Sequence, residues 1–323
     1  MAKLANLLLF LATVIIPLSS VTAAQSSYPS RPVHIIVGFG AGSSVDTATR
    51  VLARTLSKNL GQQVVVEDRP GAGSNIAADF VAHASNDGYT IFMATIANAI
   101  NATVSPNIRF DFSKDFAPIT LVGAIPMLLV AHPSLGVSNV KELIALAKRK
   151  PRQIFFGSSG TGTSSHLSGE LFNALAGVKL VHVPYSGSAQ ALTDLLAGRI
   201  SLLFSAASTT LPYVRAGKLK ALAMAQSERA KSAPQIPSMS EAGVPGFDAS
   251  VWFGLVSPAN TPPEVVDRLS RAVNDSLKSS DVIQPLHAQG IDLVGGSPDQ
   301  FSRYIQGEIE KWGGVAATAG LKR

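Results

Sequence analysis

One three-part unit occurs twice in this sequence: a short apolar strand, a loop of small residues, and a helix that begins directly after it. In the first copy, a strand at 33–37 leads into the first loop, residues 39–46 (FGAGSSVD), and a helix predicted over 45–60 with apolar residues at 45, 48, 51, 52 and 56. In the second copy, a strand at 154–156 leads into the second loop, residues 157–165, which holds only glycine, serine and threonine, and a helix predicted over 166–175. Glycine permits tight turns and the first turn of a helix has unpaired N–H groups, so each loop is suited to bind an anion. A plain strand-to-helix turn with a serine N-cap explains the first loop equally well.

The segments around these two units also alternate between strands and helices. Strands are predicted at 63–67, 89–94, 179–185, 199–205 and 219–225, and helices at 76–84, 140–150 and 189–197. This alternation predicts parallel sheets with helices on both faces, in which ligands bind at the carboxyl ends of the strands. Thr95 and Asn98 leave the strand at 89–94 on that same edge.

Two apolar segments are predicted to connect two lobes. Residues 119–131 are apolar and interrupted by Pro126, and residues 251–256 (VWFGLV) form a strong strand in the opposite half of the chain. Helices are predicted after Thr261, to about residue 277, and after Ser297, to about residue 312. We therefore expect a discontinuous lobe 1 from residues 25–124 and 248–323, and a lobe 2 from residues 125–247, joined by a hinge of two crossings.

The N-terminus has the pattern of a secretory signal peptide, residues 1–24. Lys3 precedes an apolar run over 7–16, and Thr22, Ala23 and Ala24 provide a cleavage site. The run is too short to span a bilayer, which requires about 20 residues. The chain has no cysteine, which excludes disulfides, thiolate metal sites, a cysteine nucleophile and a lipoprotein anchor. We expect a soluble periplasmic protein.

Charge and motifs exclude several function classes. The formal charge is +6, or +5 without Lys3, and it is spread along the chain, which argues against nucleic-acid binding. Dinucleotide, P-loop and H-E-x-x-H motifs are absent from the sequence, and the six histidines have no metal-ligand spacing. We predict no metal, no cofactor and no catalytic residues.

Three residues near the loops have alternative interpretations. His166 follows Ser164 and Ser165, so a serine hydrolase using residues 157–166 is one alternative, and a helix-start residue bonding loop carbonyls is the other. Asp46 either stabilises the helix start or contacts a ligand. Tyr185 is either a ligand contact or a packed loop aromatic.

Several stretches together resemble the extracytoplasmic solute receptors of tripartite tricarboxylate transporters, the Bug receptor family. They are YPSRPV from Tyr28, the first loop, EDRPGAGSNI from Glu67, DGYT from Asp87, GSSGTGTSSHLSGELF from Gly157, VHVPYSG from Val181, GKLKALA from Gly217 and VWFGL from Val251. The resemblance covers nearly the whole chain after the signal peptide, in the right order.

This resemblance implies an α/β periplasmic binding protein of type II, with a ligand cleft between two lobes. It implies a monomer that captures a small organic carboxylate and delivers it to integral membrane transporter subunits. A periplasmic ligand sensor for a membrane kinase is an alternative that the same fold permits. Carried over by motif, the ligand-binding positions are Phe39, Ala41, Gly42, Ser43, Thr95, Asn98, Ser158, Gly160, Thr161 and Thr163. We add Tyr185 and Ser205 as two further candidate ligand contacts.

The sequence departs from the family pattern at two places. Many members have F-x-P-G-G in the first loop, where this chain has Phe39-Gly40-Ala41-Gly42-Ser43. Many also have an aspartate after the strand that ends at Phe204, where this chain has Ser205. Loss of that carboxylate leaves a less acidic pocket and argues against an amino-acid ligand.

Overall fold

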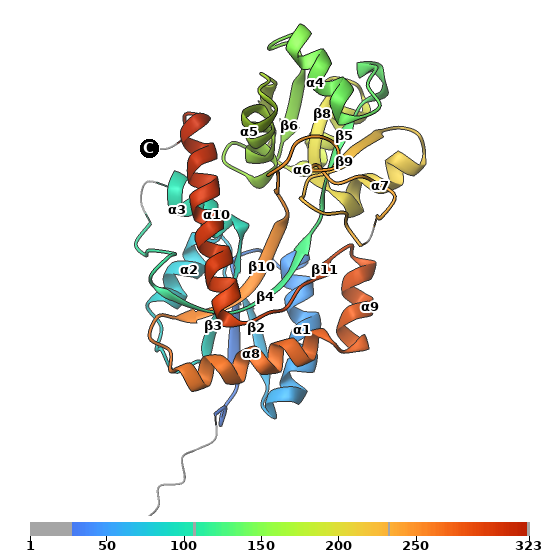
Figure 1. The fold of residues 1–323 in the computed structure, drawn as a ribbon. Coiled ribbons are helices and arrows are strands. Elements are labelled where there is room, and N and C mark those ends of the chain that lie inside the picture. The colour runs from blue at the N-terminus through green and yellow to red at the C-terminus, as the bar shows by residue number, and fades with distance from the viewer. Residues whose placement is uncertain (1–27, 106–107, 232, 322–323) are drawn as a thin grey trace, which may run out of the picture.

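The computed structural model describes residues 28–105, 108–231 and 233–321. These residues form two β-sheets, one above the other, each covered by helices (Figure 1). The α/β two-sheet architecture predicted from the sequence is confirmed. The predicted signal peptide lies outside the described residues.

The first sheet has six strands in the order β11-β4-β10-β3-β1-β2. β1 pairs in parallel with β2 and β3, as predicted, but β10 is antiparallel to both β3 and β4, so the sheet is mixed rather than parallel. The reason is that β10 carries the chain back from the second sheet and enters from the opposite end. The strands are β1 (Val33–Val37), β2 (Val64–Asp68), β3 (Thr90–Thr95), β4 (Phe116–Ile125), β10 (Val251–Pro258) and β11 (Asp292–Leu293).

Helices cover both faces of the first sheet. One face packs against α1 (Ser44–Leu60), α8 (Pro263–Leu277) and α9 (Ser280–Ala288). The other face packs against α2 (Asn75–Ala82), α3 (Ile96–Val104) and α10 (Pro298–Thr318). A short 3₁₀ turn, η1 (Ala72–Ser74), precedes α2. α1 buries Val45, Ala48, Leu52 and Leu56 along the face that the periodicity predicted, and Gly61 ends it in the left-handed conformation.

The second sheet has five strands in the order β7-β6-β8-β5-β9, and β5 is antiparallel to both neighbours. The strands are β5 (Met127–Ala131), β6 (Phe155–Ser158), β7 (Val181–Pro184), β8 (Leu202–Ala206) and β9 (Lys220–Met224). The helices are α4 (Val140–Arg149), α5 (Ser164–Ala176), α6 (Ser188–Leu196) and α7 (Ala207–Arg215), with a 3₁₀ turn η2 (Pro133–Leu135) before α4.

Two chain segments connect the sheets, and hydrogen bonds hold them side by side. Pro126 alone separates β4 from β5, and the segment after β9 returns to β10. Ala225 N–H donates to the Met127 carbonyl at 2.7 Å, and Ala249 N–H donates to the Ala225 carbonyl at 2.9 Å. The connection between the sheets is therefore a narrow, ordered pair of crossings.

α10 links the two sheets a third time. It runs from the first sheet upward beside α3 and ends alongside α5 of the second sheet (Figure 1). It extends to Thr318, beyond the predicted end near Trp312, because Trp312, Val315 and Ala316 are all buried by packing. This packing outweighs the poor helix propensity of Gly313 and Gly314.

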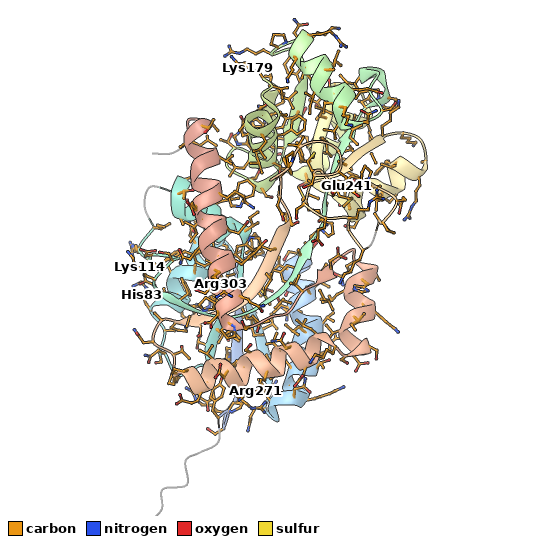
Figure 2. The ribbon with its side chains drawn as sticks, in the orientation of Figure 1. His83, Lys114, Lys179, Glu241, Arg271 and Arg303 are labelled. Carbon is orange, nitrogen blue, oxygen red and sulfur yellow. The ribbon has the colours of Figure 1, made fainter. Side chains whose placement is uncertain are left out.

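Charged side chains lie mainly on the outside of the molecule. Lys179 and Arg271, both exposed, lie at opposite ends of it (Figure 2). Among the described residues, no helix is both long and apolar enough to cross a membrane. The same residues contain no group of three or more histidine, aspartate or glutamate side chains placed to hold a metal ion.

Candidate functional site

A cavity of about 270 Å³ lies where elements of the two sheets meet. Its floor is at the crossings, where Ile125 of β4 pairs with Val251 of β10. Seven of its thirteen lining residues carry hydroxyl groups, and none is ionisable. The hydroxyl residues are Ser44, Ser159, Ser164, Ser165, Ser188, Ser205 and Thr209, and the apolar ones are Ile125, Met127, Leu203, Phe204, Ala206 and Val251.

Four helices begin at this cavity. Ser44 is the first residue of α1, Ser164 and Ser165 open α5, Ser188 opens α6, and Ala206 is the N-cap of α7. The first turn of each helix has N–H groups without intrahelical partners and carries the positive end of the helix dipole. The cavity is thus positively polarised without any cationic side chain, which favours an anionic ligand.

The hydroxyl groups of the cavity differ in whether they already form hydrogen bonds within the protein. Ser165 Oγ accepts from the Ser159 N–H at 3.0 Å and lies 3.1 Å from Ser159 Oγ and 3.2 Å from Thr163 Oγ1. Within the described part of the chain, Ser44, Ser164, Ser188, Ser205 and Thr209 make no such side-chain hydrogen bond. These five hydroxyls are therefore available to a ligand.

The first loop is bonded internally rather than open. Gly42 has a φ of +80°, and its N–H donates to Asp46 Oδ2 at 2.8 Å. Ser43 is the N-cap of α1, and its Oγ accepts from the Asp46 N–H at 3.2 Å. Asp46 thus stabilises the helix start, which is the first of the two roles considered for it above. Phe39 and Ala41 lie in the same loop outside the cavity lining, and Ser44 reaches the cavity in their place.

An arginine balances the charge of Asp46. Arg50 Nε lies 2.6 Å from Asp46 Oδ1, and its Nη2 lies 2.8 Å from Asp68 Oδ2. Burial, followed by the neighbouring Asp46, raises the pKa of Asp68, and the two carboxylates raise the pKa of Arg50 against the effect of desolvation. The network joins the first loop to the end of β2 through one arginine that two carboxylates share.

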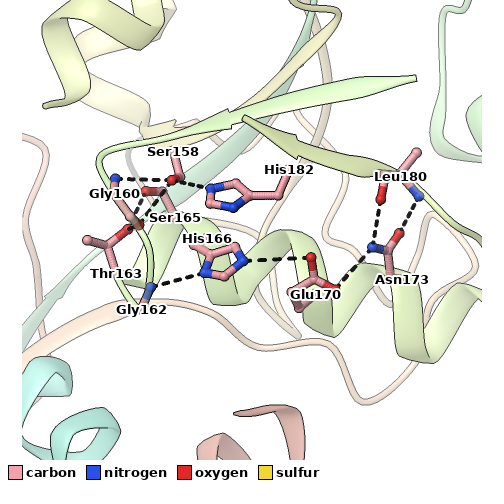
Figure 3. Close-up of polar contacts among 10 residues, drawn as sticks. All are labelled: Ser158, Gly160, Gly162, Thr163, Ser165, His166, Glu170, Asn173, Leu180 and His182. Carbon is pink, nitrogen blue, oxygen red and sulfur yellow. Dashed lines mark hydrogen bonds and ion pairs between the residues drawn. The ribbon is translucent and has the colours of Figure 1, made fainter. Parts of the chain in front are cut away.

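The second loop is also bonded internally. Thr163 Oγ1 donates to the Gly160 carbonyl at 2.6 Å, and Gly160 N–H donates to Ser158 Oγ at 3.1 Å. Gly162 N–H donates to His166 Nδ1 at 3.0 Å (Figure 3). Thr161 is exposed at the tip of the loop. The cavity is bordered by Ser159, Ser164 and Ser165 instead of the four expected positions.

Of the remaining expected positions, Thr95, Asn98 and Tyr185 lie outside the cavity lining. Thr95 and Asn98 form a capping box at the start of α3, where Asn98 Oδ1 accepts from the Thr95 N–H at 2.9 Å. Asn98 Nδ2 is buried without a hydrogen-bond partner among the described residues. Tyr185 donates its hydroxyl to Asp194 Oδ2 at 2.9 Å, and burial raises its pKa. Ser205 is the one expected position that lines the cavity.

Two histidines lie directly behind the second loop. The rings of His166 and His182 stack with centroids 3.7 Å apart, and burial lowers the pKa of each to about 4. His182 Nε2 lies 2.6 Å from Ser158 Oγ, a pair that sequence spacing did not reveal. The carboxylate of Glu170 contacts the other histidine, with its Oε1 3.8 Å from His166 Nε2. A serine–histidine–carboxylate relay through His166 is not formed, because its Nδ1 accepts a backbone N–H.

Comparison with known proteins shows what this fold and sequence are similar to. Residues 48–321 match the model of the tripartite tricarboxylate transporter family receptor. The chain is 37% identical over 301 residues to protein BugT of Bordetella pertussis, covering 93% of this chain and 92% of that protein.

Two solved structures are similar throughout. Rpa4515 of R. palustris, solved with adipate, is 37% identical with a TM-score of 0.74, covering 91% of this chain and 98% of that one. MatC (Rpa3494) from Rhodopseudomonas palustris, solved with bound malate, is 32% identical with a TM-score of 0.71, covering 89% of this chain and 99% of that one.

Proposed function

The chain belongs to the tripartite tricarboxylate transporter receptor family, and from this we propose that it is a periplasmic receptor for a small dicarboxylate. It delivers this ligand to the integral membrane subunits of a transporter. The observation that carries the proposal is the cavity between the sheets, where hydroxyl groups and four helix N-termini meet without an ionisable side chain.

The polarity of the cavity supports two negative charges on the ligand. Each helix N-terminus acts as roughly half a positive charge, so four of them are matched by a dianion. The relatives solved with adipate and with malate were each solved with a dicarboxylate. The hydroxyls supply neutral donors, and a hydrogen bond to a charged group contributes about 1.5–3 kcal/mol.

The same lining disfavours a ligand with an ammonium group. Buried charges require a partner, and the lining residues offer no carboxylate to an amine. Ser205, at the cavity, is the position where a carboxylate would change this. The protein therefore selects dicarboxylates over α-amino acids.

Thermal unfolding with a ligand panel tests the proposal. Adipate, malate, citrate, benzoate and glutamate are compared at equal concentration, because a ligand present at 100 times its Kd stabilises the folded state by about 2.7 kcal/mol. We expect a dicarboxylate to raise Tm and glutamate to leave it unchanged. Stabilisation by glutamate alone would contradict the proposal.

Ser205→Asp tests the charge argument at one residue. A carboxylate at this position faces the bound dianion, and we expect affinity for the best dicarboxylate of the panel to fall at least tenfold by calorimetry, which is about 1.4 kcal/mol. Ser227→Asp is the matched control, because Ser227 is exposed and outside the cavity lining. Equal losses in both variants would show that net charge, rather than the cavity, governs binding.

Delivery to a transporter is tested separately. The purified protein, with and without its ligand, is incubated with solubilised membranes and recaptured. Ligand-dependent capture of transporter subunits supports delivery, whereas capture of a sensor kinase would favour the signalling alternative.

A further inference from the structure

We propose that His166 and His182 are positioning residues for the second loop, each acting through one defined ring nitrogen. The second loop borders the cavity through Ser159, Ser164 and Ser165, so the consequence for ligand binding rests on the proposed function. The effect of the two histidines on the conformation of the loop does not depend on the proposed function.

His166 acts through Nδ1. It is the third residue of α5, and its Nδ1 accepts the N–H of Gly162 at 3.0 Å (Figure 3). Gly162 has a φ of +79°, so its N–H points back from a turn that only glycine adopts without strain. An acceptor at the δ position of residue 166 therefore fixes the C-terminal half of the loop.

His182 acts through Nε2. It projects from β7, next to β6, and its Nε2 lies 2.6 Å from Ser158 Oγ. The same Oγ accepts the Gly160 N–H at 3.1 Å. A polar atom at the ε position of residue 182 therefore fixes the side chain that holds the N-terminal half of the loop.

The two rings support each other. They stack face to face, and Phe156 of β6 lies beneath both, with centroids 6.4 Å from His166 and 5.2 Å from His182. Gly169 of α5 allows this packing, since a Cβ there would lie 2.1 Å from the Phe156 ring. Both rings are therefore held in place before any ligand arrives.

The arrangement requires a neutral His166 imidazole. A proton on His166 Nδ1 would turn the acceptor of the Gly162 N–H into a second donor facing it. The elements packed against α5 provide little counter-charge, because α3, β6 and β8 carry no ionisable side chain and β7 carries His182. Glu170 is the nearest carboxyl at 3.8 Å, and it shares an outer groove with Arg152 and Lys179. α10 contributes Asp299, Arg303, Tyr304, Glu308, Glu310 and Lys311, of which Glu308 and Lys311 pair with each other.

Amide isosteres separate positioning from simple packing. Asparagine places a polar atom near the δ position of histidine and glutamine near the ε position. We expect His166→Asn and His182→Gln to keep the loop, and His166→Gln and His182→Asn to lose it. The preference between asparagine and glutamine is thus opposite at the two positions, which side-chain size alone would not produce.

Hydrogen exchange of the ligand-free protein measures the outcome. We expect the Gly162 amide in His166→Gln and the Gly160 amide in His182→Asn to exchange at least tenfold faster than in the wild type. His166→Asn and His182→Gln should remain within about threefold. In the wild type, exchange of the Gly162 amide, corrected for the intrinsic rate, should rise below pH 5. The same ranking of asparagine and glutamine at both positions, or unchanged exchange in all four variants, would overturn the proposal.

Imidazole ¹⁵N NMR of the wild type keeps the test independent of whether the variants fold. We expect His166 to carry its proton on Nε2 at pH 7 and to stay neutral at pH 5.5, with exposed His287 as the reference ring. A proton on Nδ1 of His166 would overturn its assigned role. Neither measurement needs a ligand, so failure of adipate or malate to bind would count against the proposed function alone.

Discussion

The backbone of Gly42 is held at a φ of +80°, with its N–H donated to the carboxylate of Asp46. Arg50 pairs with the other oxygen of that carboxylate, Oδ1. A ligand carboxylate approaching this N–H would compete with Asp46 for it. The first loop is therefore already satisfied by its own helix, and Ser44 is the residue that presents a free hydroxyl to the cavity.

Gly42→Ala and Gly40→Ala form a matched pair that tests this conformation. A Cβ at either glycine meets no atom within 4 Å, but only Gly42 has a positive φ. We expect Gly42→Ala to lower the free energy of unfolding by about 1 kcal/mol, and Gly40→Ala to leave it within about 0.5 kcal/mol. Urea denaturation measures both. Equal values for the two variants would show that the loop relaxes its backbone.

The lowered pKa values of the two buried histidines make the stability of the folded protein depend on pH. Burial lowers the pKa of His166 from 6.5 to about 4, so the unfolded chain binds more protons than the folded one between these values. The contribution of this ring to stability is therefore greatest above pH 6.5 and falls by roughly 3 kcal/mol as the pH is lowered toward 4. Glu170 acts in the opposite direction, because burial raises its pKa and favours its protonated form.

Urea denaturation between pH 4 and pH 7 measures this dependence. The double variant His166→Asn, His182→Gln removes both rings and serves as the control. We expect the difference in stability between the two proteins to shrink as the pH falls through this range. A constant difference would show that the rings titrate alike in the folded and unfolded states.

At the scale of the elements, regular patterns were predictable and packing was not. The apolar spacing placed the start of α1 within one residue of the observed start. Helices α7 and α9 were not predicted, because Pro212 and Pro285 within them resemble helix breaks. The end of α10 was missed because its burial depends on α3 and α5, which are distant in sequence.

In the candidate site, too, the local sequence patterns were predictable and the packing was not. The two loops and Ser205 were found from small-residue and strand patterns. Ser44, Ser164 and Ser188, the first residues of helices, were missed as cavity-lining residues. Only the three-dimensional structure shows that Gly42 and Gly162 donate to side chains of their own helices, because that depends on side-chain rotamers. His182 is placed beside Ser158 by strand pairing and had no local signature.

Glu308 tests how firmly α10 is fixed to the crossing strand β10. Its buried Oε2 accepts the indole N–H of Trp252 at 2.8 Å and of Trp312 at 2.9 Å, and its Oε1 pairs with Lys311. Lys311 also donates to the Asp248 carbonyl in the return crossing.

We expect Glu308→Ala to lower the free energy of unfolding by about 3–5 kcal/mol, because it leaves a partly buried ammonium and two indole N–H groups without their acceptor. Exposed Glu310→Ala on the same helix should change stability by less than about 0.5 kcal/mol in the same urea titration. Similar costs for both would mean that the cluster is not a structural anchor.

The whole molecule is organised around the two crossings between its sheets. Residues of both sheets line the cavity, but the expected contacts Gly42, Ser43, Thr95 and Asn98 of the first sheet lie outside its lining. If these residues contact the ligand, the sheets must approach each other on binding. The paired crossings at Met127, Ala225 and Ala249 allow a hinge rotation, while α10, packed on α3 and α5, must slide or bend with it.

Small-angle scattering of the protein in solution tests this closure. We expect the radius of gyration to decrease when a saturating dicarboxylate is added, because the two sheets close around the cavity. Ser205→Asp at the same ligand concentration is the control, since its weakened binding should leave the radius close to the ligand-free value. An unchanged radius in the wild type, measured where calorimetry shows full occupancy, would mean that the cavity binds its ligand without closure. Gly42, Ser43, Thr95 and Asn98 would then not be ligand contacts, and the hydroxyls that already line the cavity would account for binding by themselves.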